Sequence, residues 1–135
     1  MKIKYMILLL VLGTFLASCG SGGASTNLNV VMTDFQFSPN QFTVPAGQEI
    51  TLNITNSGAV VHNFIIMKLG TDAGQAFDAE DEANVYWEEV DIQPGGDLST
   101  HFTAPADPGD YQIVCKTEGH ILSGMVAKLT VVAGE

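Results

Sequence analysis

The sequence contains no arginine, and its five lysines face 15 aspartates and glutamates. Two of the lysines stand among the first four residues, which leaves the rest of the chain with three lysines and a net charge of −12. Because such a chain repels polyanions, we expect it to bind neither nucleic acid nor anionic lipid surfaces. A basic protein partner suits this charge, and an equally good explanation is that the charge keeps the protein soluble.

Cysteine is also scarce, with residues at positions 19 and 115 alone. The predicted folded domain contains Cys115 but not Cys19, so a framework of disulfides is excluded. A domain of this length buries roughly two-thirds of its unfolded surface and can fold without such links. A single thiol in an exported domain is either an inert core residue or a reactive or metal-bound one.

The sequence also lacks an apolar run long enough to span a bilayer. The run Tyr5–Leu12 is too short to do so by itself. It follows two lysines and precedes Leu-Ala-Ser-Cys at positions 16–19, an arrangement typical of a secretory signal. The Leu-Ala-Ser-Cys motif resembles the bacterial lipobox, in which the cysteine is lipidated after cleavage. An ordinary signal cleaved near Ala17, with Cys19 incidental, is the alternative.

These features predict a signal peptide over residues 1–18 and a lipidated Cys19. The small residues that follow it predict a flexible tether over 19–26 and a folded domain over 27–135. The protein is therefore expected to be exported and lipid-anchored to a membrane, on its periplasmic or extracellular face.

Apolar and polar residues alternate along most of the predicted domain, which is the pattern of half-buried strands. We predict strands over Asn27–Phe37, Phe42–Val44, Glu49–Thr55, His62–Lys68, Leu98–Ala104, Tyr111–Cys115 and Met125–Val132. Short strands separated by Gly/Pro turns predict an all-β fold with a β-sandwich architecture. The acidic segment 70–89 breaks the pattern, and we interpret it as a surface insertion that can hold a short helix.

Four side chains of metal-binding type stand out in this framework. Cys115, His120 and Met125 follow one another at intervals of five residues, and His62 lies far upstream. Two imidazoles, a thiolate and a thioether form the ligand set of blue copper, in which Met is a weak axial ligand. Taken singly, Cys115 and Met125 are equally well explained as core residues, and His62 as a hydrogen-bonded residue at the core edge.

Strand parity indicates that these side chains can meet, because successive side chains point to opposite faces of a sheet. Cys115, Met125 and His62 each share a face with mostly large apolar residues, so that face should point into the core. His120 lies on the loop between the last two predicted strands. His101 shares its face with polar residues, so we expect it to face solvent and do not count it as a ligand.

The same segments resemble the cupredoxins over about residues 35–132. The resemblance rests on residues 37–48, on Val61-His62-Asn63-Phe64, on Pro108-Gly109-Asp110-Tyr111 and on the loop 115–125. It implies a Greek-key β-sandwich that carries electrons on one type 1 copper ion. The copper ligands implied are His62, Cys115, His120 and Met125.

The resemblance also implies roles for residues around the ligands. Asn63 would tie the first-ligand loop to the cysteine loop by hydrogen bonds. His120 would present a ring edge to solvent between Ile121 and Leu122, where redox partners would dock. Glu118 departs from the family, which often has proline at that place.

Within the family, the two four-residue gaps between Cys, His and Met are most similar to those of the auracyanins. The azurins have one residue fewer in the second gap. The similarity suggests partners in a respiratory or photosynthetic chain, such as a cytochrome or a membrane complex.

Three other functions stay open at this stage. An enzyme of the nitrite reductase or oxidase kind needs a second, open copper, which His101 alone cannot build. A copper store or chaperone usually has exposed Met and His clusters, which the sequence lacks. A purely structural surface lipoprotein would make the ligand set a coincidence. The single cysteine of the domain rules out a two-cysteine dinuclear copper site.

Overall fold

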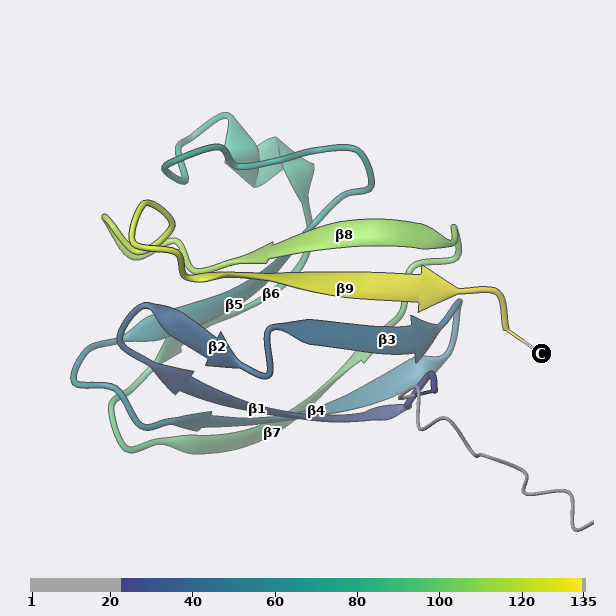
Figure 1. Ribbon diagram of the computed structural model, residues 1–135, viewed down its shortest axis with the longest axis horizontal. Helices are drawn as coiled ribbons and strands as arrows, with labels where there is room; N and C mark the ends of the chain where they lie inside the picture. The colour runs from purple at the N-terminus through teal and green to yellow at the C-terminus, as the bar shows by residue number, and fades with distance from the viewer. Residues whose placement is uncertain (1–22, 135) are drawn as a thin grey trace, which may run out of the picture.

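The computed structural model describes residues 23–134, which form a sandwich of two β-sheets (Figure 1). The strands are β1 (Asn27–Thr33), β2 (Gln36–Ser38), β3 (Gln41–Pro45), β4 (Glu49–Asn56), β5 (His62–Met67), β6 (Val85–Ile92), β7 (Asp97–Thr103), β8 (Gly109–Val114) and β9 (Val126–Val132). One sheet has the order β2-β1-β4-β7 and the other β3-β9-β8-β5-β6. The predicted all-β sandwich is confirmed.

The alternation in the sequence explains how the sheets pack. Strand β4 buries Ile50, Leu52 and Ile54 on one face and leaves the residues between them partly exposed. These side chains join a core that also contains Phe64 and Leu129 of the opposite sheet. Each such side chain stabilises the fold by about 1.5–3 kcal/mol relative to leaving it exposed.

Two elements differ from the sequence predictions. The first predicted strand is interrupted by a turn at Asp34–Phe35, which separates β1 from the antiparallel β2. Part of the predicted insertion over 70–89 is strand β6, which pairs with β5 at the edge of its sheet. An edge strand tolerates charged residues, and the acidic side chains of β6 concealed its strand character. The helix expected in this segment is one 3₁₀ turn, η1 (Asp81–Asn84).

The β5–β6 connection (residues 68–84) covers the outer face of its sheet, as Figure 1 shows above β5 and β8. Its Ala73 and Phe77 pack with Ile65, Val114 and Ile121 in a second apolar cluster. Strand β5 is therefore buried on both faces. No helix within residues 23–134 is long and apolar enough to cross a membrane.

Three strand ends meet at one end of the sandwich. Strand β5 begins at His62, β8 ends just before Cys115, and β9 begins just after Met125. The loop between β8 and β9 lies at the left of Figure 1, at the opposite end of the molecule from the C-terminus. This arrangement brings the predicted ligand residues to a single end, beside the β1–β2 turn.

Candidate metal centre

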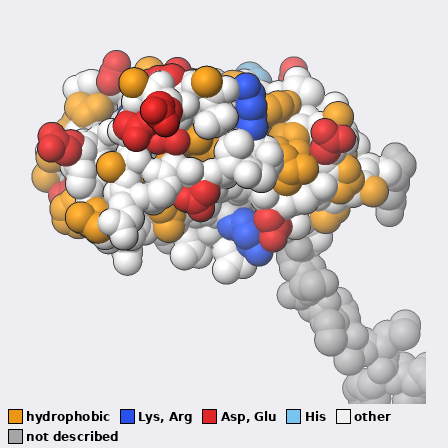
Figure 2. All heavy atoms as spheres, turned by 90° about the horizontal axis from the view of Figure 1, so that it is seen from above, with side chains coloured by type: hydrophobic (Ala, Val, Ile, Leu, Met, Phe, Trp, Pro, Cys, Tyr) orange, Lys and Arg blue, Asp and Glu red, His pale blue; other side chains and the backbone are white. Residues whose placement is uncertain are grey.

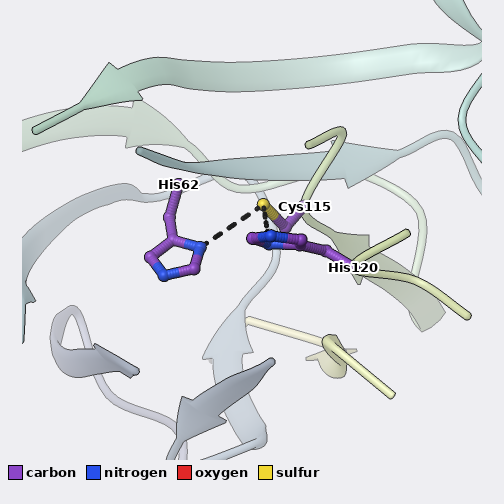
Figure 3. Close-up of side chains that lie close together, drawn as sticks. All are labelled: His62, Cys115 and His120. Atoms are coloured by element: carbon purple, nitrogen blue, oxygen red, sulfur yellow. Dashed lines mark hydrogen bonds between the residues drawn. The ribbon is translucent and has the colours of Figure 1, made fainter. Parts of the chain in front are cut away.

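The structure brings His62, Cys115 and His120 together in one buried group. Their ligand atoms all lie within 4.8 Å of one another, and the three residues are 0%, 0% and 5% exposed. The Sγ atom of Cys115 is 3.8 Å from Nδ1 of His62 and 3.5 Å from Nδ1 of His120 (Figure 3). Both imidazoles thus turn the same nitrogen toward the sulfur.

These distances suit a single ion bound between the three side chains. Protein-bound zinc, a comparable first-row ion, lies about 2.0–2.1 Å from imidazole nitrogen and about 2.3 Å from thiolate sulfur. Two such bonds that meet at about 110–120° place nitrogen and sulfur roughly 3.6–3.8 Å apart. The Cys115 distances of 3.8 and 3.5 Å are close to this range. One soft sulfur and two imidazoles suit copper or zinc more than magnesium or calcium.

Two glycines shape the β8–β9 loop around the group. Gly119 and Gly124 have φ angles of 79° and 96°, which L-residues rarely adopt, and they directly precede His120 and Met125. The Met125 N–H donates to the His120 carbonyl oxygen at 2.9 Å. Met125 is fully buried and belongs to the same core cluster as Cys115. The loop therefore places the thioether residue at the same end of the core.

Asn63 lies at the centre of the hydrogen bonds around the sulfur. Its backbone N–H donates to Cys115 Sγ at 3.4 Å, and its Nδ2 donates to Thr117 Oγ1 at 3.1 Å. The Asp91 N–H donates to Asn63 Oδ1 at 3.1 Å, and Thr117 Oγ1 donates to the Val61 carbonyl at 3.0 Å. Asn63 thus joins the first-ligand strand to the cysteine loop, which is the place that the family resemblance implied for it.

Sequence reasoning missed two residues of the β1–β2 turn. Asp34 Oδ1 lies 3.3 Å from His62 Nε2. The ring of Phe35 stands edge-on to the His120 imidazole, with centroids 5.2 Å apart and an angle of 81° between the planes. The irregular alternation of the first predicted strand was the one signal available, and it indicates a turn without indicating its contacts.

The surroundings of His120 favour its neutral form. Burial lowers the pKa of the His120 imidazole, repulsion from His62 lowers it further, and the Asp34 carboxylate opposes both effects. A pKa below the ordinary value leaves the ring neutral at pH 7, which is the form that binds a metal ion.

The surface next to His120 differs from the expectation. His120 is 5% exposed, so little of its ring edge reaches solvent. Ile121 is 7% exposed and packs in the second apolar cluster, so the expectation that it lies at the surface is wrong. Leu122 is 70% exposed and Phe35 is 45% exposed, so these two form the apolar surface there.

His101 lies outside the group, as predicted. It is exposed on β7, and its Nδ1 is 3.3 Å from the Thr51 hydroxyl on β4. The position of Cys19, the predicted lipid attachment site, falls outside the described residues.

Comparisons with known proteins place the chain among the cupredoxin-like proteins. The family model of the cupredoxin-like domain matches residues 6–131. Auracyanin-A of Chloroflexus aurantiacus is 26% identical over 148 aligned positions, which cover 89% of this chain and 91% of that protein. The solved structure of reduced auracyanin from the photosynthetic bacterium Roseiflexus castenholzii is 32% identical, with a TM-score of 0.70 over 82% of this chain and 99% of that one. The structure of auracyanin A from Chloroflexus aurantiacus, described as a "blue" copper protein, is 26% identical, with a TM-score of 0.64 over 82% and 100% of the two chains.

Proposed function

The chain belongs to the cupredoxin-like family, and from this premise we propose that it is an electron carrier with one type 1 copper ion. The observation that carries the proposal is the buried group of His62, Cys115 and His120, with its sulfur–nitrogen distances of 3.8 and 3.5 Å. These three residues and the thioether of Met125 would hold the ion. When bound, the copper gains and loses one electron between Cu(II) and Cu(I).

The residues around the site favour electron transfer, because they hold the ligand side chains in nearly the same positions in both oxidation states. Imidazoles suit Cu(II), whereas thiolate and thioether suit Cu(I), so the mixed set needs little rearrangement when the charge changes. Cys115 would bind as thiolate, and the Asn63 N–H, which donates to the sulfur, would stabilise its negative charge. Burial and the hydrogen bonds of Asn63 and Thr117 restrict the movement of the loop that carries the ligands.

Copper-loaded protein tests this proposal directly. We expect the oxidised protein to be intensely blue and to give the EPR spectrum of a type 1 centre, and a redox titration should show one electron per chain. The variant Cys115→Ser should lose the colour and keep the circular dichroism of a β-sandwich. A wild-type protein that binds Cu(II) at the site but stays colourless contradicts the assignment.

The role is carriage of electrons rather than catalysis. Four protein side chains would hold the ion, which would leave substrate no open position, and the burial of His62, Cys115 and Met125 keeps substrate away from it. Sustained turnover of nitrite or oxygen by the purified copper protein would contradict this part of the proposal.

Redox partners would dock at the end of the molecule where Leu122 and Phe35 are exposed. The net charge of −12 outside the first four residues supports a basic partner, such as a cytochrome or a membrane complex. Figure 2 shows the excess of acidic side chains over lysines on one face. Electron-transfer rates to a basic cytochrome should fall steeply with salt, and rates that are independent of salt contradict this partner class.

A lipid on Cys19 would tether the protein to the outer face of a bacterial membrane. The support for this location is the Leu-Ala-Ser-Cys motif after a short apolar run. In this position the carrier would exchange electrons with complexes of a respiratory or photosynthetic chain.

A further inference from the structure

We propose that Asp34 is a positioning residue of the metal centre, which holds the His62 imidazole with its Nδ1 turned to the Cys115 sulfur. The inference rests on the proposed function, because it concerns the same centre. Asp34 Oδ1 lies 3.3 Å from His62 Nε2, and the two side chains are 38% and 0% exposed. The carboxylate thus approaches a fully buried ring from the rim of the site.

The tautomer of the ring connects this contact to the metal. A neutral imidazole carries its proton on one nitrogen and offers a lone pair on the other. A carboxylate next to Nε2 accepts a hydrogen bond from Nε2–H, so the lone pair stays on Nδ1. Nδ1 is the atom that faces Cys115 Sγ at 3.8 Å. Asp34 therefore selects the form of His62 that can bind an ion beside the sulfur.

A second contact fixes the carboxylate independently of the ring. The backbone N–H of Ala59 donates to both Asp34 oxygens, at 3.0 and 3.2 Å. Ala59 belongs to the loop that leads into His62, so Asp34 ties the β1–β2 turn to that loop. The orientation of the carboxylate is thus set by backbone, which is what a positioning residue requires.

The space for the Asp34–His62 contact depends on a glycine. A Cβ added at Gly58 would lie 2.5 Å from Asp34 Oδ1 and 2.6 Å from His62 Nε2, much closer than packed atoms approach. Gly58 is not among the residues with positive φ, so its backbone does not itself require glycine. The absent side chain at position 58 instead leaves room for the contact.

The next residue of the turn contacts the other imidazole. Phe35 has a φ of 71°, which is unusual for an aromatic residue, and its ring stands edge-on to His120. A strained conformation persists where the surrounding contacts determine it, and such residues gather at functional sites. The two residues of this turn thus contact both imidazoles of the group.

The test compares wild type with Asp34→Asn, Asp34→Ala and Gly58→Ala. Glu49→Gln serves as a control, because it removes the same charge at the end of β4 that is remote from the site. In copper-free protein, ¹⁵N NMR should show the wild-type His62 ring protonated at Nε2, and Asp34→Ala and Gly58→Ala should show a mixture of tautomers.

Copper affinity should fall roughly 10–100-fold in Asp34→Ala and in Gly58→Ala. Asp34→Asn should raise the reduction potential, because it removes a negative charge that favours Cu(II), whereas Glu49→Gln should leave the potential unchanged.

The outcomes separate this inference from the proposed function. A wild-type protein that binds no copper contradicts the proposed function, while the tautomer of His62 still tests the role of Asp34. Protonation of wild-type His62 at Nδ1 overturns the inference even if the Asp34 variants fail to fold. A blue wild type whose Asp34→Ala and Gly58→Ala variants keep its tautomer, affinity and potential overturns it as well.

Discussion

Among single residues, Asn63 connects several parts of the metal centre through its hydrogen bonds. It is 4% exposed, and both its backbone and its side chain make hydrogen bonds. The backbone N–H donates to the Cys115 sulfur at 3.4 Å, and the side-chain Nδ2 lies 3.8 Å from the same sulfur. The side chain also donates to Thr117 and accepts from the Asp91 N–H. Substitution of the side chain therefore removes its bonds to Thr117 and Asp91 and its longer contact with the sulfur, and keeps the backbone hydrogen bond to the sulfur.

We expect Asn63→Ala to destabilise the copper-free protein by about 1–3 kcal/mol, because it removes the acceptor of the Asp91 N–H and the donor to the Thr117 hydroxyl, which keeps its bond to the Val61 carbonyl. The copper protein should stay blue, since the backbone N–H to the sulfur remains. Urea unfolding of the copper-free protein gives the free energy. Asn40→Ala is the control, because it removes the same side chain from an exposed position between β2 and β3. Equal stabilities of Asn63→Ala and wild type would contradict this role.

At the scale of elements, the β5–β6 connection supports the ligand loop from outside the sandwich. Phe77 packs against the cluster that contains Ile121, the neighbour of His120. Lys116, the neighbour of Cys115, lies 5.8 Å from the Phe77 ring centroid and within 3.1 Å and 3.6 Å of Glu88 and Glu82. Burial disfavours the Lys116 ammonium, but the two carboxylates outweigh it and raise its pKa. These contacts hold the loop segment that joins Cys115 to His120 at both of its ends.

We therefore expect Phe77→Ala to loosen the loop more than the fold. The amide hydrogens of His120 and Ile121 should exchange faster in the copper-free variant, while exchange in the core of β4 should stay close to wild type. Val31→Ala, a truncation of an exposed side chain on the opposite sheet, is the control. Unchanged exchange at His120 in Phe77→Ala would show that the connection does not support the loop.

The elements also show how far the sequence could lead. Strand β4 was predictable because its alternation matches one buried face. The proximity of Cys115, His120 and Met125 was predictable because one short loop between two strands carries all three. Strand β6 was missed because it lies at an edge and carries charge on both faces. The contact of Asp34 with His62 spans 28 residues and two sheets, and no local pattern encodes such a contact.

At the scale of the whole molecule, the metal centre and the start of the described chain lie at opposite ends of the sandwich. Strand β1 begins at Asn27 and ends at Thr33, next to the turn that contacts both imidazoles. A strand of this length spans about 20 Å. A tether attached before Asn27 would therefore hold the proposed docking surface of Phe35 and Leu122 away from the membrane.

This geometry leads to a prediction about Cys19. The variant Cys19→Ala should be released from the membrane fraction into the soluble fraction, because the substitution removes the proposed site of lipidation. Its colour and potential should equal those of wild type, since the centre lies at the far end of the sandwich. Centrifugation of cell extracts, with the blue colour and an antibody as readouts, measures where the protein is found, and a redox titration measures the potential.

The variant Ser21→Ala, two residues further along the tether, controls for a general effect on export. A Cys19→Ala protein that still sediments with membranes would show that something other than a lipid holds it there.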